Sequence, residues 1–348
     1  MSDTPRRAWR IDRAGSLDRL RCVDEVLPPP APAEVRLRVT AIGLNFADAF
    51  ACQGLYSATP SGSFVPGLEC AGIVEAVGPD VTRWRPGDQV LALTRFGGYA
   101  TALNIDARYL HPVPRGWTLE QAAAWPVQAL TAWYGLVSLG NVQRDAIVLV
   151  QSAAGGVGLQ ALALLERLGA RAIAVVGSDA KRPFLREHGR LDDARIITRQ
   201  QRDFAAQLDA ALRAAGGSGF DVVFDAVLGP WFEPAFQRLA PEGRYVLYGA
   251  ADFMSAGARP SWPRLAWRWL RRPRLDPLAM ISANRGLLAF NLIWLWESVN
   301  RMPAAFAALD ALALPPPHIG ARFPFDGARK ALTTLQSGAT TGKLLLTV

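Results

Sequence analysis

The chain has 348 residues, of which 50% are hydrophobic and 20% charged, so it is long enough for two domains with separate cores. Three cysteines and three histidines are too few for a disulfide scaffold or a cysteine-rich zinc module, and we expect a reducing compartment, the cytoplasm. The net charge of +8 comes from basic residues spread over the whole length, which argues against a nucleic-acid partner. Residues 1–13 mix acidic and basic side chains, so we expect no secretory signal, and no apolar run approaches the ~20 residues of a membrane-spanning helix.

Short segments rich in β-forming residues fill the first third of the chain. Residues 34–40 alternate with period two, and residues 72–77 and 88–93 follow as further strands bounded by Gly, Pro and Asp. From Thr118 the pattern changes to an Ala-rich segment with helical spacing. The first third therefore predicts a β-rich barrel or sandwich.

After Asp145, strands and helices alternate at the intervals of βαβ units, which predicts an α/β fold with a doubly wound parallel sheet. We expect strands at 146–151, 172–176, 195–198, 221–224 and 244–248, and helices at 156–168, 180–188, 204–215 and 231–239. A helix over 325–337 and a strand over 343–348 end the chain, and we expect this tail to complete the first domain. The predicted division is 1–126 with 297–348 for the β-rich domain, and 127–296 for the α/β domain.

A glycine turn between the first strand and helix of the α/β domain carries the strongest local signal. Residues 153–158 have the pattern A-x-G-x-x-G, whose small residues permit a tight turn, close approach of a pyrophosphate, and close packing of the helix on the strand. Phosphate groups bind at helix N-termini, where backbone N–H groups are free. The sequence therefore predicts a dinucleotide site whose contacts are Ala154, Gly155, Gly156, Val157 and Gly158.

The residues after the second strand of this domain bear on the choice of cofactor. An NAD enzyme places Asp or Glu here to bind the ribose 2′-hydroxyl, whereas this chain has Gly177, then Ser178 and the cation Lys181. A small residue followed by cations suits a 2′-phosphate, so we favour NADPH. A strand that ends two residues later would instead make Asp179 the ribose ligand and NADH the cofactor. Lys181 and Arg182 can also be read as a solvated first turn of a helix.

Ordered motif blocks carry a resemblance over nearly the whole chain. The blocks lie at 45–48, 54–56, 66–72, 77–78, 87–88, 98–100, 122–133 and 153–158. In this order they resemble the medium-chain dehydrogenase/reductase superfamily, in particular its zinc-independent quinone oxidoreductase (zeta-crystallin-like) branch. Residues 283–295 are similar to the vesicle amine transport protein subgroup. The resemblance implies a GroES-like β-rich catalytic domain, a Rossmann domain, a cleft between them, and a homodimer.

The same resemblance bears on the chemistry. Zinc-dependent relatives have Cys at the place of Asn45 and His at the place of Leu68, so we expect no metal. Hydrogen bonds would then polarise the substrate carbonyl while NADPH delivers a hydride, which suits apolar conjugated acceptors. The resemblance thus implies reduction of quinones or α,β-unsaturated carbonyl compounds. The alternative is a membrane-associated lipid-binding protein of the vesicle amine transport type, with little or no reductase activity.

The resemblance also implies roles for individual residues. Asn45 and Thr131 would lie near the nicotinamide or substrate, and Tyr56 would be the proton donor or an aromatic lid. Asp48 would act in chemistry, or else cap a helix or form a salt bridge. Arg199 stands where the family has tyrosine, and could pair with a 2′-phosphate. Further cofactor contacts would be Val227, Gly249, Phe290, Asn291, Leu292 and Lys343, although Lys343 can also be read as the start of a strand.

Residues 259–274 contain six arginines and three tryptophans, which predicts a short, basic, amphipathic helix between Pro263 and Pro273. Such a helix could cover the active-site cleft or lie on an anionic membrane surface. We favour the cover, because the segment interrupts the nucleotide domain before its last strand and its large apolar residues would shape a substrate pocket.

Overall fold

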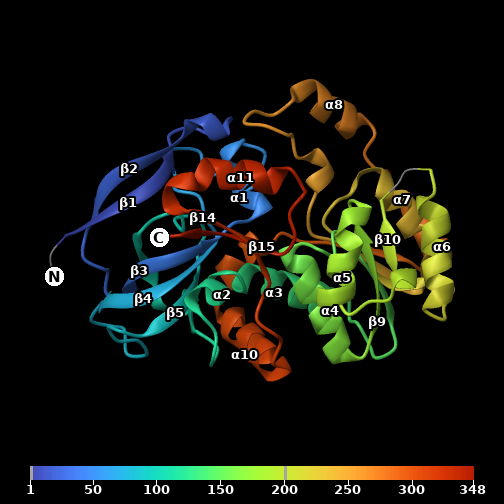
Figure 1. Cartoon of the computed structure of the whole chain (residues 1–348), viewed down its shortest axis with the longest axis horizontal. Coiled ribbons are helices and arrows are strands. Elements are labelled where there is room, and N and C mark those ends of the chain that lie inside the picture. The colour runs from blue at the N-terminus through green and yellow to red at the C-terminus, as the bar shows by residue number, and fades with distance from the viewer. Residues whose placement is uncertain (1–2, 200–201) are drawn as a thin grey trace.

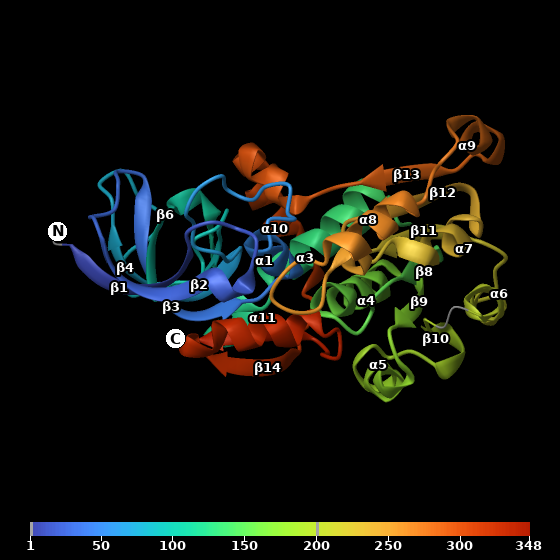
Figure 2. The same ribbon diagram turned by 90° about the horizontal axis from the view of Figure 1, so that it is seen from above.

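A computed structural model describes residues 3–199 and 202–348 of the chain. It has a β-rich part and an α/β part that lie side by side, and the end of the chain returns to the β-rich part (Figures 1 and 2). This confirms the predicted fold class. Within the described residues, no helix is both long enough and apolar enough to cross a membrane.

The β-rich part consists of a hairpin and a seven-stranded sheet. The hairpin pairs β1 (Thr4–Ile11) with β2 (Leu20–Leu27). The sheet has the order β14-β15-β3-β4-β5-β7, with β6 paired to β3. Its strands are β3 (Glu34–Gly43), β4 (Glu69–Val77), β5 (Gln89–Leu93), β6 (Ala102–Asp106), β7 (Leu110–Pro112), β14 (Ile319–Pro324) and β15 (Lys343–Thr347). Three helices accompany it: α1 (Phe46–Cys52), α2 (Leu119–Ala123) and α11 (Ala328–Gln336).

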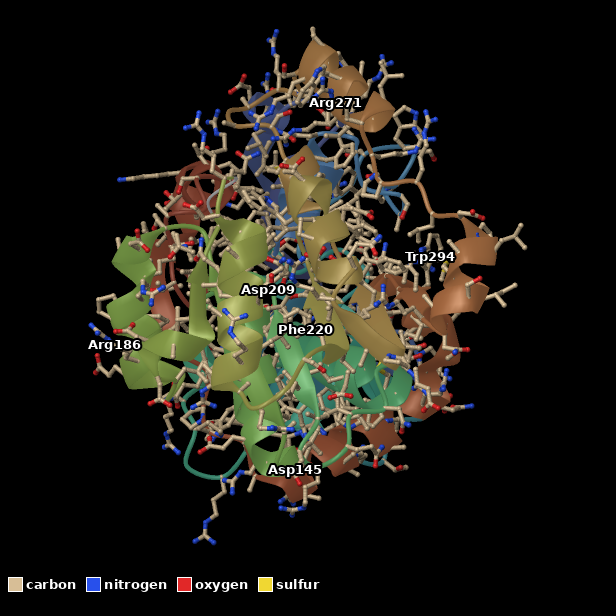
Figure 3. All side chains as sticks on the ribbon, turned by 90° about the vertical axis from the view of Figure 1, so that its right-hand side faces the viewer. Asp145, Arg186, Asp209, Phe220, Arg271 and Trp294 are labelled. Atoms are coloured by element: carbon tan, nitrogen blue, oxygen red, sulfur yellow. The ribbon has the colours of Figure 1, made fainter. Side chains whose placement is uncertain are left out.

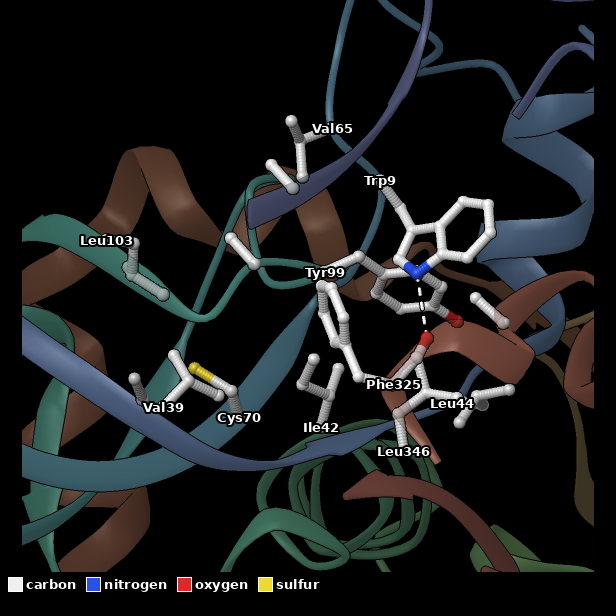
Figure 4. Packing of buried hydrophobic residues seen from close by; sticks show 14 of the residues in the cluster. Trp9, Val39, Ile42, Leu44, Val65, Cys70, Tyr99, Leu103, Phe325 and Leu346 are labelled. Carbon is white, nitrogen blue, oxygen red and sulfur yellow. Dashed lines mark hydrogen bonds between the residues drawn. The ribbon is translucent and has the colours of Figure 1, made fainter. Parts of the chain in front are cut away.

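The core of this part joins residues from both ends of the chain (Figure 4). Trp9 on β1 packs beside Phe325, and its indole Nε1 donates a hydrogen bond to the Phe325 carbonyl oxygen at 2.8 Å. Tyr99 and Leu346 are fully buried in the same cluster. The C-terminal segment is thus an integral part of this core.

The α/β part is built on a six-stranded sheet of order β10-β9-β8-β11-β12-β13 in which all neighbours are parallel. Its strands are β8 (Ile147–Val150), β9 (Arg171–Val176), β10 (Ile196–Thr198), β11 (Phe220–Asp225), β12 (Leu239–Leu247) and β13 (Gly286–Ala289). Its helices include α4 (Gly156–Leu168), α5 (Arg182–His188), α6 (Phe204–Ala214) and α7 (Phe232–Phe236). The order is that of a doubly wound dinucleotide-binding sheet, whose strand order reverses between β8 and β11.

Two connections link the parts. The first is α3 (Pro126–Trp133), which continues into a π-helical segment (Tyr134–Leu139). The second runs from β13 through a 3-10 segment (Leu292–Arg301) and α10 (Met302–Leu312) to β14. One buried cluster contains residues of both connections and of the seven-stranded sheet. The domain boundaries at residues 126 and 296 stay a prediction.

The segment between β12 and β13 reaches the β-rich part. Residues 254–258 cross to the β-rich part, where Met254 is buried and the Ala258 carbonyl accepts from the Leu17 N–H at 2.9 Å. The chain then forms α8 (Trp262–Leu270) and α9 (Pro277–Ala283), neither of which contains a buried residue. Residues 254–258 therefore contact the β-rich part, and a cleft cover formed by residues 259–274 stays a prediction.

Candidate active site

The glycine turn has the geometry that the sequence predicts. Gly155 is the N-cap of α4, at the carboxyl end of β8. A Cβ atom on Gly158 would lie only 2.5 Å from the Cα of Ala153, so α4 can pack this closely on β8 only with glycine there. The N-terminus of a 13-residue helix thus lies beside the point where the strand order reverses.

Other turns follow the parallel strands at the same edge of the sheet. After β11, the Asp225 carboxylate accepts from the N–H groups of Val227 at 2.7 Å and Leu228 at 3.0 Å. After β12, Gly249 packs so closely that a Cβ would lie 2.8 Å from the Ala226 carbonyl oxygen. Because the strands are parallel, these turns and residues 290–292 after β13 share one edge with the glycine turn.

Arg199 lies where the adenosine end of a dinucleotide would bind in such a sheet. Its guanidinium nitrogen Nη2 lies 3.5 Å from Ser152 Oγ in the glycine turn. The same nitrogen would be 3.3 Å from a Cβ on Gly177, which directly follows β9. Burial lowers the pKa of the Arg199 guanidinium, and the carboxylates of Asp225 and Asp252 oppose this shift. The geometry places a half-buried cation beside a residue with no side chain.

Ser178 and Lys181 follow β9 as predicted. One interpretation of the sequence made Lys181 a solvated residue in the first turn of a helix, but the structure partly buries it. Its Nζ donates to the carbonyl oxygens of Gly338 at 2.6 Å and Thr340 at 2.7 Å, just before β15. Burial lowers the pKa of the Lys181 ammonium. Asp179 Oδ1 accepts from Thr198 Oγ1 at 2.5 Å, so this carboxylate lies against the end of β10.

A buried polar network lies where the two parts meet. Glu69 Oε1 accepts from Lys343 Nζ at 2.5 Å, Asn45 Nδ2 at 2.9 Å and Gln128 Nε2 at 2.9 Å. Its other oxygen, Oε2, accepts from the Val127 N–H at 2.8 Å. Lys343 begins β15, Glu69 begins β4, and Gln128 lies in α3. One carboxylate therefore holds four chain segments together.

The Asn45 amide is engaged in the same network. Its Oδ1 accepts from Gln128 Nε2 and Lys343 Nζ, both at 2.9 Å, while its Nδ2 donates to Glu69. Gln128 also faces the glycine turn, since a Cβ on Gly156 would lie 3.0 Å from Gln128 Oε1. Sequence reasoning assigned no role to Glu69 or Gln128, although both lie inside the motif blocks.

Asp48 is in contact with the backbone of Asn45. It caps α1, because its Oδ2 accepts from the Asn45 N–H at 2.8 Å and from Tyr99 Oη at 3.0 Å. Burial raises the pKa of the Asp48 carboxyl to about 7, while its hydrogen bonds and the charge of Lys343 lower it. Asp48 therefore has the geometry of a helix cap, which is one of its predicted roles.

Tyr56 connects the β-rich part to the edge of the parallel sheet. Its phenol donates to Asn291 Oδ1 at 2.7 Å, and Asn291 Nδ2 donates to Ser57 Oγ at 3.3 Å. Burial raises the pKa of the Tyr56 phenol to about 12, so the group stays protonated at neutral pH. Thr131 is buried in α3. Tyr56 and Asn291, predicted separately, are thus in direct contact.

The donor set around Asn45 does not fit a zinc ion. Asparagine and leucine occupy positions 45 and 68, and Glu69 already pairs with the Lys343 ammonium. In the parts of the chain that the structure describes, no group of three His, Cys, Asp or Glu side chains could hold a metal ion.

The chain matches two family models. Residues 31–115 match the alcohol dehydrogenase GroES-like domain, and residues 192–346 match the zinc-binding dehydrogenase family. It is 32% identical to the human "synaptic vesicle membrane protein VAT-1 homolog" over 337 residues, which is 95% of this chain and 84% of that protein. The chain belongs to the medium-chain dehydrogenase/reductase superfamily. Its place in the zeta-crystallin-like branch, predicted from the motif blocks, and in the VAT-1 subgroup, predicted from residues 283–295, is confirmed.

Solved structures agree with this assignment. The Escherichia coli quinone oxidoreductase complexed with NADPH is 26% identical, with a TM-score of 0.83 over 99% of this chain and 100% of that one. Mycobacterial Rv1454c complexed with NADPH is 30% identical, with a TM-score of 0.81 over 99% of this chain and 100% of that one. The β-rich part is therefore a GroES-like domain and the α/β part a Rossmann-like domain, in a family of oxidoreductases.

Proposed function

We propose that this protein is a zinc-independent, NADPH-dependent reductase of quinones or α,β-unsaturated carbonyl compounds. The observation that carries the choice of cofactor is the Arg199 guanidinium beside Gly177, where an NAD enzyme would present an acid. A guanidinium pairs well with a phosphate, and a 2′-phosphate distinguishes NADPH from NADH. The NADPH complexes of the Escherichia coli and mycobacterial relatives support this choice.

The edge of the parallel sheet fits the remainder of the cofactor. Residues 154–158 would hold the pyrophosphate at the N-terminus of α4, with Ser178 and Lys181 at the 2′-phosphate. Lys181 uses two of the three N–H donors of its ammonium on carbonyl oxygens, so a third can reach a phosphate. The turns at Val227 and Gly249 and residues 290–292 would lie beside the nicotinamide.

The proposed chemistry needs little from the protein beyond orientation and one donor. NADPH, when bound, supplies a hydride, and a conjugated acceptor spreads the resulting negative charge onto its oxygen. We assign Tyr56 as the hydrogen-bond donor to that oxygen, since its phenol stays protonated at neutral pH. Its single O–H donates to Asn291 Oδ1 in this structure and would turn to the substrate oxygen when substrate binds. Asn45 and Thr131 would shape the floor of the site, and Asp48 would position Asn45 by capping α1.

The remaining proposals concern assembly and location. We propose a cytoplasmic homodimer, as the family resemblance implies. The strand β13 lies at an edge of the six-stranded sheet, where its outer backbone groups could pair with a second copy. Light scattering on the purified protein measures this directly, and a monomer at all concentrations would contradict it.

Titration with NADPH and with NADH tests the choice of cofactor. Arg199→Gln should weaken NADPH binding by about 10- to 100-fold and leave NADH binding within about twofold, because a charge-assisted hydrogen bond contributes roughly 1.5–3 kcal/mol. Arg186→Gln is the matched control, since Arg186 pairs with Asp193 on the exposed side of α5. An unchanged ratio of the two affinities in Arg199→Gln would remove the 2′-phosphate assignment.

Turnover tests the substrate class. The protein should oxidise NADPH with naphthoquinone and cyclohexenone but not with cyclohexanone, which lacks the conjugated double bond. Tyr56→Phe should lower kcat by roughly 10- to 100-fold with little change in NADPH affinity, since it removes one donor to the developing oxyanion. Full activity in that variant would leave Tyr56 as a lid only. Binding of neither cofactor would favour the lipid-binding alternative.

A further inference from the structure

A cavity of about 440 Å³ lies between the GroES-like domain and the C-terminal end of α10. One wall comes from the segment after β7, with Arg115 and Trp117, and another from the last turn of α10, with Asp310. Figure 1 shows α10 below α3, at the lower edge of the ribbon. None of the residues that line the cavity belongs to the proposed cofactor or substrate site. Its volume is within the range of small-molecule sites, roughly 300–1,000 Å³.

Two tryptophans line this cavity. The ring centroids of Trp117 and Trp125 lie 5.4 Å apart, and the two rings are nearly perpendicular, at 83°. Trp125 is only 2% exposed, and its Nε1–H has no hydrogen-bond partner in the part of the chain that the structure describes. Buried donors without a partner are uncommon, and a ligand that brings an acceptor to this wall would give the donor one. The cavity therefore favours an aromatic ligand that also carries polar groups.

One carboxylate lines the cavity. Asp310 Oδ2 lies 3.1 Å from His111 Nε2, and the Asp310 side chain is 48% exposed. Burial lowers the pKa of the His111 imidazole, although the charge of Asp310 opposes this shift. The ring is therefore neutral at neutral pH and does not cancel the negative charge of Asp310.

The end of α10 adds to this negative charge. The C-terminus of a helix carries partial negative charge, which favours cations. Arg167 already uses this preference, because its Nη2 donates to the carbonyl oxygen of Ala313, the C-cap of α10, at 3.0 Å. The side of the cavity around Asp310 thus suits the ammonium of a ligand.

Arg115 supplies the opposite charge. It is exposed, and within residues 3–199 and 202–348 its guanidinium forms no ion pair or hydrogen bond. A guanidinium pairs with a carboxylate through two parallel N–H groups. The cavity therefore combines a site for an anion, a site for a cation and aromatic walls.

We propose that this cavity binds a free aromatic amino acid. The ligand carboxylate pairs with Arg115, its ammonium pairs with Asp310, and its ring packs against Trp117. The end of a peptide fits less well, because it carries only one of the two charges. This site goes beyond the proposed reductase function and does not depend on it.

Titration of the full chain with L-tryptophan, followed by ligand-observed NMR, tests the proposal. A ligand of about 15 non-hydrogen atoms should bind with a dissociation constant of roughly 0.1–1 mM. Tryptamine lacks the carboxylate and indole-3-propionate lacks the ammonium, so each should bind about tenfold more weakly. Glycine, which has both charges but no ring, should not bind. Equal affinity for the three indole compounds would overturn the proposal.

Two variants assign the charges to their partners. Arg115→Gln should weaken L-tryptophan binding by about tenfold and leave tryptamine binding within about twofold, because tryptamine has no carboxylate to lose a partner. Asp310→Asn should weaken L-tryptophan binding by about tenfold and leave indole-3-propionate binding within about twofold.

The matched controls are Arg186→Gln and Asp209→Asn, at residues that lie on the Rossmann-like domain (Figure 3). Arg186 pairs with Asp193, and Asp209, whose side chain is 44% exposed, pairs with Arg238. Both controls should bind L-tryptophan as the unaltered protein does. An absence of binding at about 10 mM L-tryptophan, or equal losses in the cavity variants and the controls, would overturn the proposal. The titration needs no turnover, so a failure of the proposed reductase function would leave its result unchanged.

Discussion

The buried pair Lys343–Glu69 gives the sharpest test of what joins the two domains. Lys343→Met removes the ammonium and keeps an apolar side chain of similar length. The Glu69 carboxylate would keep three N–H donors, from Asn45, Gln128 and the Val127 backbone, but would lose its only contact with a full positive charge among the described residues. Removing one partner of a buried ion pair costs about 3–5 kcal/mol. Because three donors remain, we expect a loss near the lower end, about 3 kcal/mol.

The double variant Lys343→Met with Glu69→Gln should recover much of that loss, because no uncompensated charge is then buried. Urea unfolding, followed by circular dichroism, measures the free energy of unfolding of the unaltered protein, the two single variants and the double variant. Lys330→Met is the control, since Lys330 is exposed on α11. We expect a coupling energy of about 2 kcal/mol or more between the two sites. If Lys343→Met is as stable as the unaltered protein, or if the two losses simply add, the pair does not hold the domains as we argue.

Two further predictions concern Asp48 and Gly158. The pKa of the Asp48 carboxyl is raised from 3.8 to about 7, so the protonated carboxyl stabilises the folded state. This stabilisation is at most about 4 kcal/mol; it is fully present below pH ~4 and is lost as the pH rises to about 7. Melting temperatures of Asp48→Asn should lack this pH dependence, and parallel curves of melting temperature against pH for both proteins would contradict the prediction. Gly158→Ala should cost roughly 1–3 kcal/mol and weaken NADPH binding, because its Cβ would overlap Ala153. Calorimetry measures both the stability and the NADPH affinity of this variant. Gly62→Ala is the control, because a Cβ at Gly62 would meet no atom within 4 Å. Equal stability of the two variants would count against the packing argument.

Local patterns predicted the elements of the Rossmann-like domain well where capping residues mark their ends. The helix predicted over 156–168 agrees with α4 at both ends, because Gly155 is its N-cap and Gly169, with φ of 72°, ends it in the left-handed conformation. The strand predicted from residue 244 begins instead at Leu239, and the preceding helix ends at Phe236. Pro241 and Gly243 are turn residues in isolation, but pairing of Leu239 with Phe220 on β11 extends the strand through them.

The candidate site was predictable only in the parts that local sequence controls. The glycine turn and the small residue after β9 are visible in short segments. The partner of Glu69, in contrast, is Lys343, 274 positions away in the sequence. Likewise, the carbonyl partners of Lys181 belong to the turn before β15. A single sequence carries no signal for such pairs, because they arise only when the C-terminal strand returns to the first domain.

The return of the C-terminal strand to the first domain explains why the glycine turn and the polar network lie side by side. The N–H of Gly342 donates to the Ala154 carbonyl at 2.8 Å, which ties the start of β15 to the glycine turn. Gly342 has a φ of 59°, and a Cβ there would lie 2.5 Å from the His318 carbonyl oxygen, so only glycine fits without strain. The next residue, Lys343, enters the network with Glu69 and Asn45. A displacement of the glycine turn would therefore move the chain one residue away from the buried ion pair of Lys343 and Glu69. If NADPH binds at residues 154–158 as we propose, its binding has a direct route to Asn45 and Glu69 through Gly342 and Lys343.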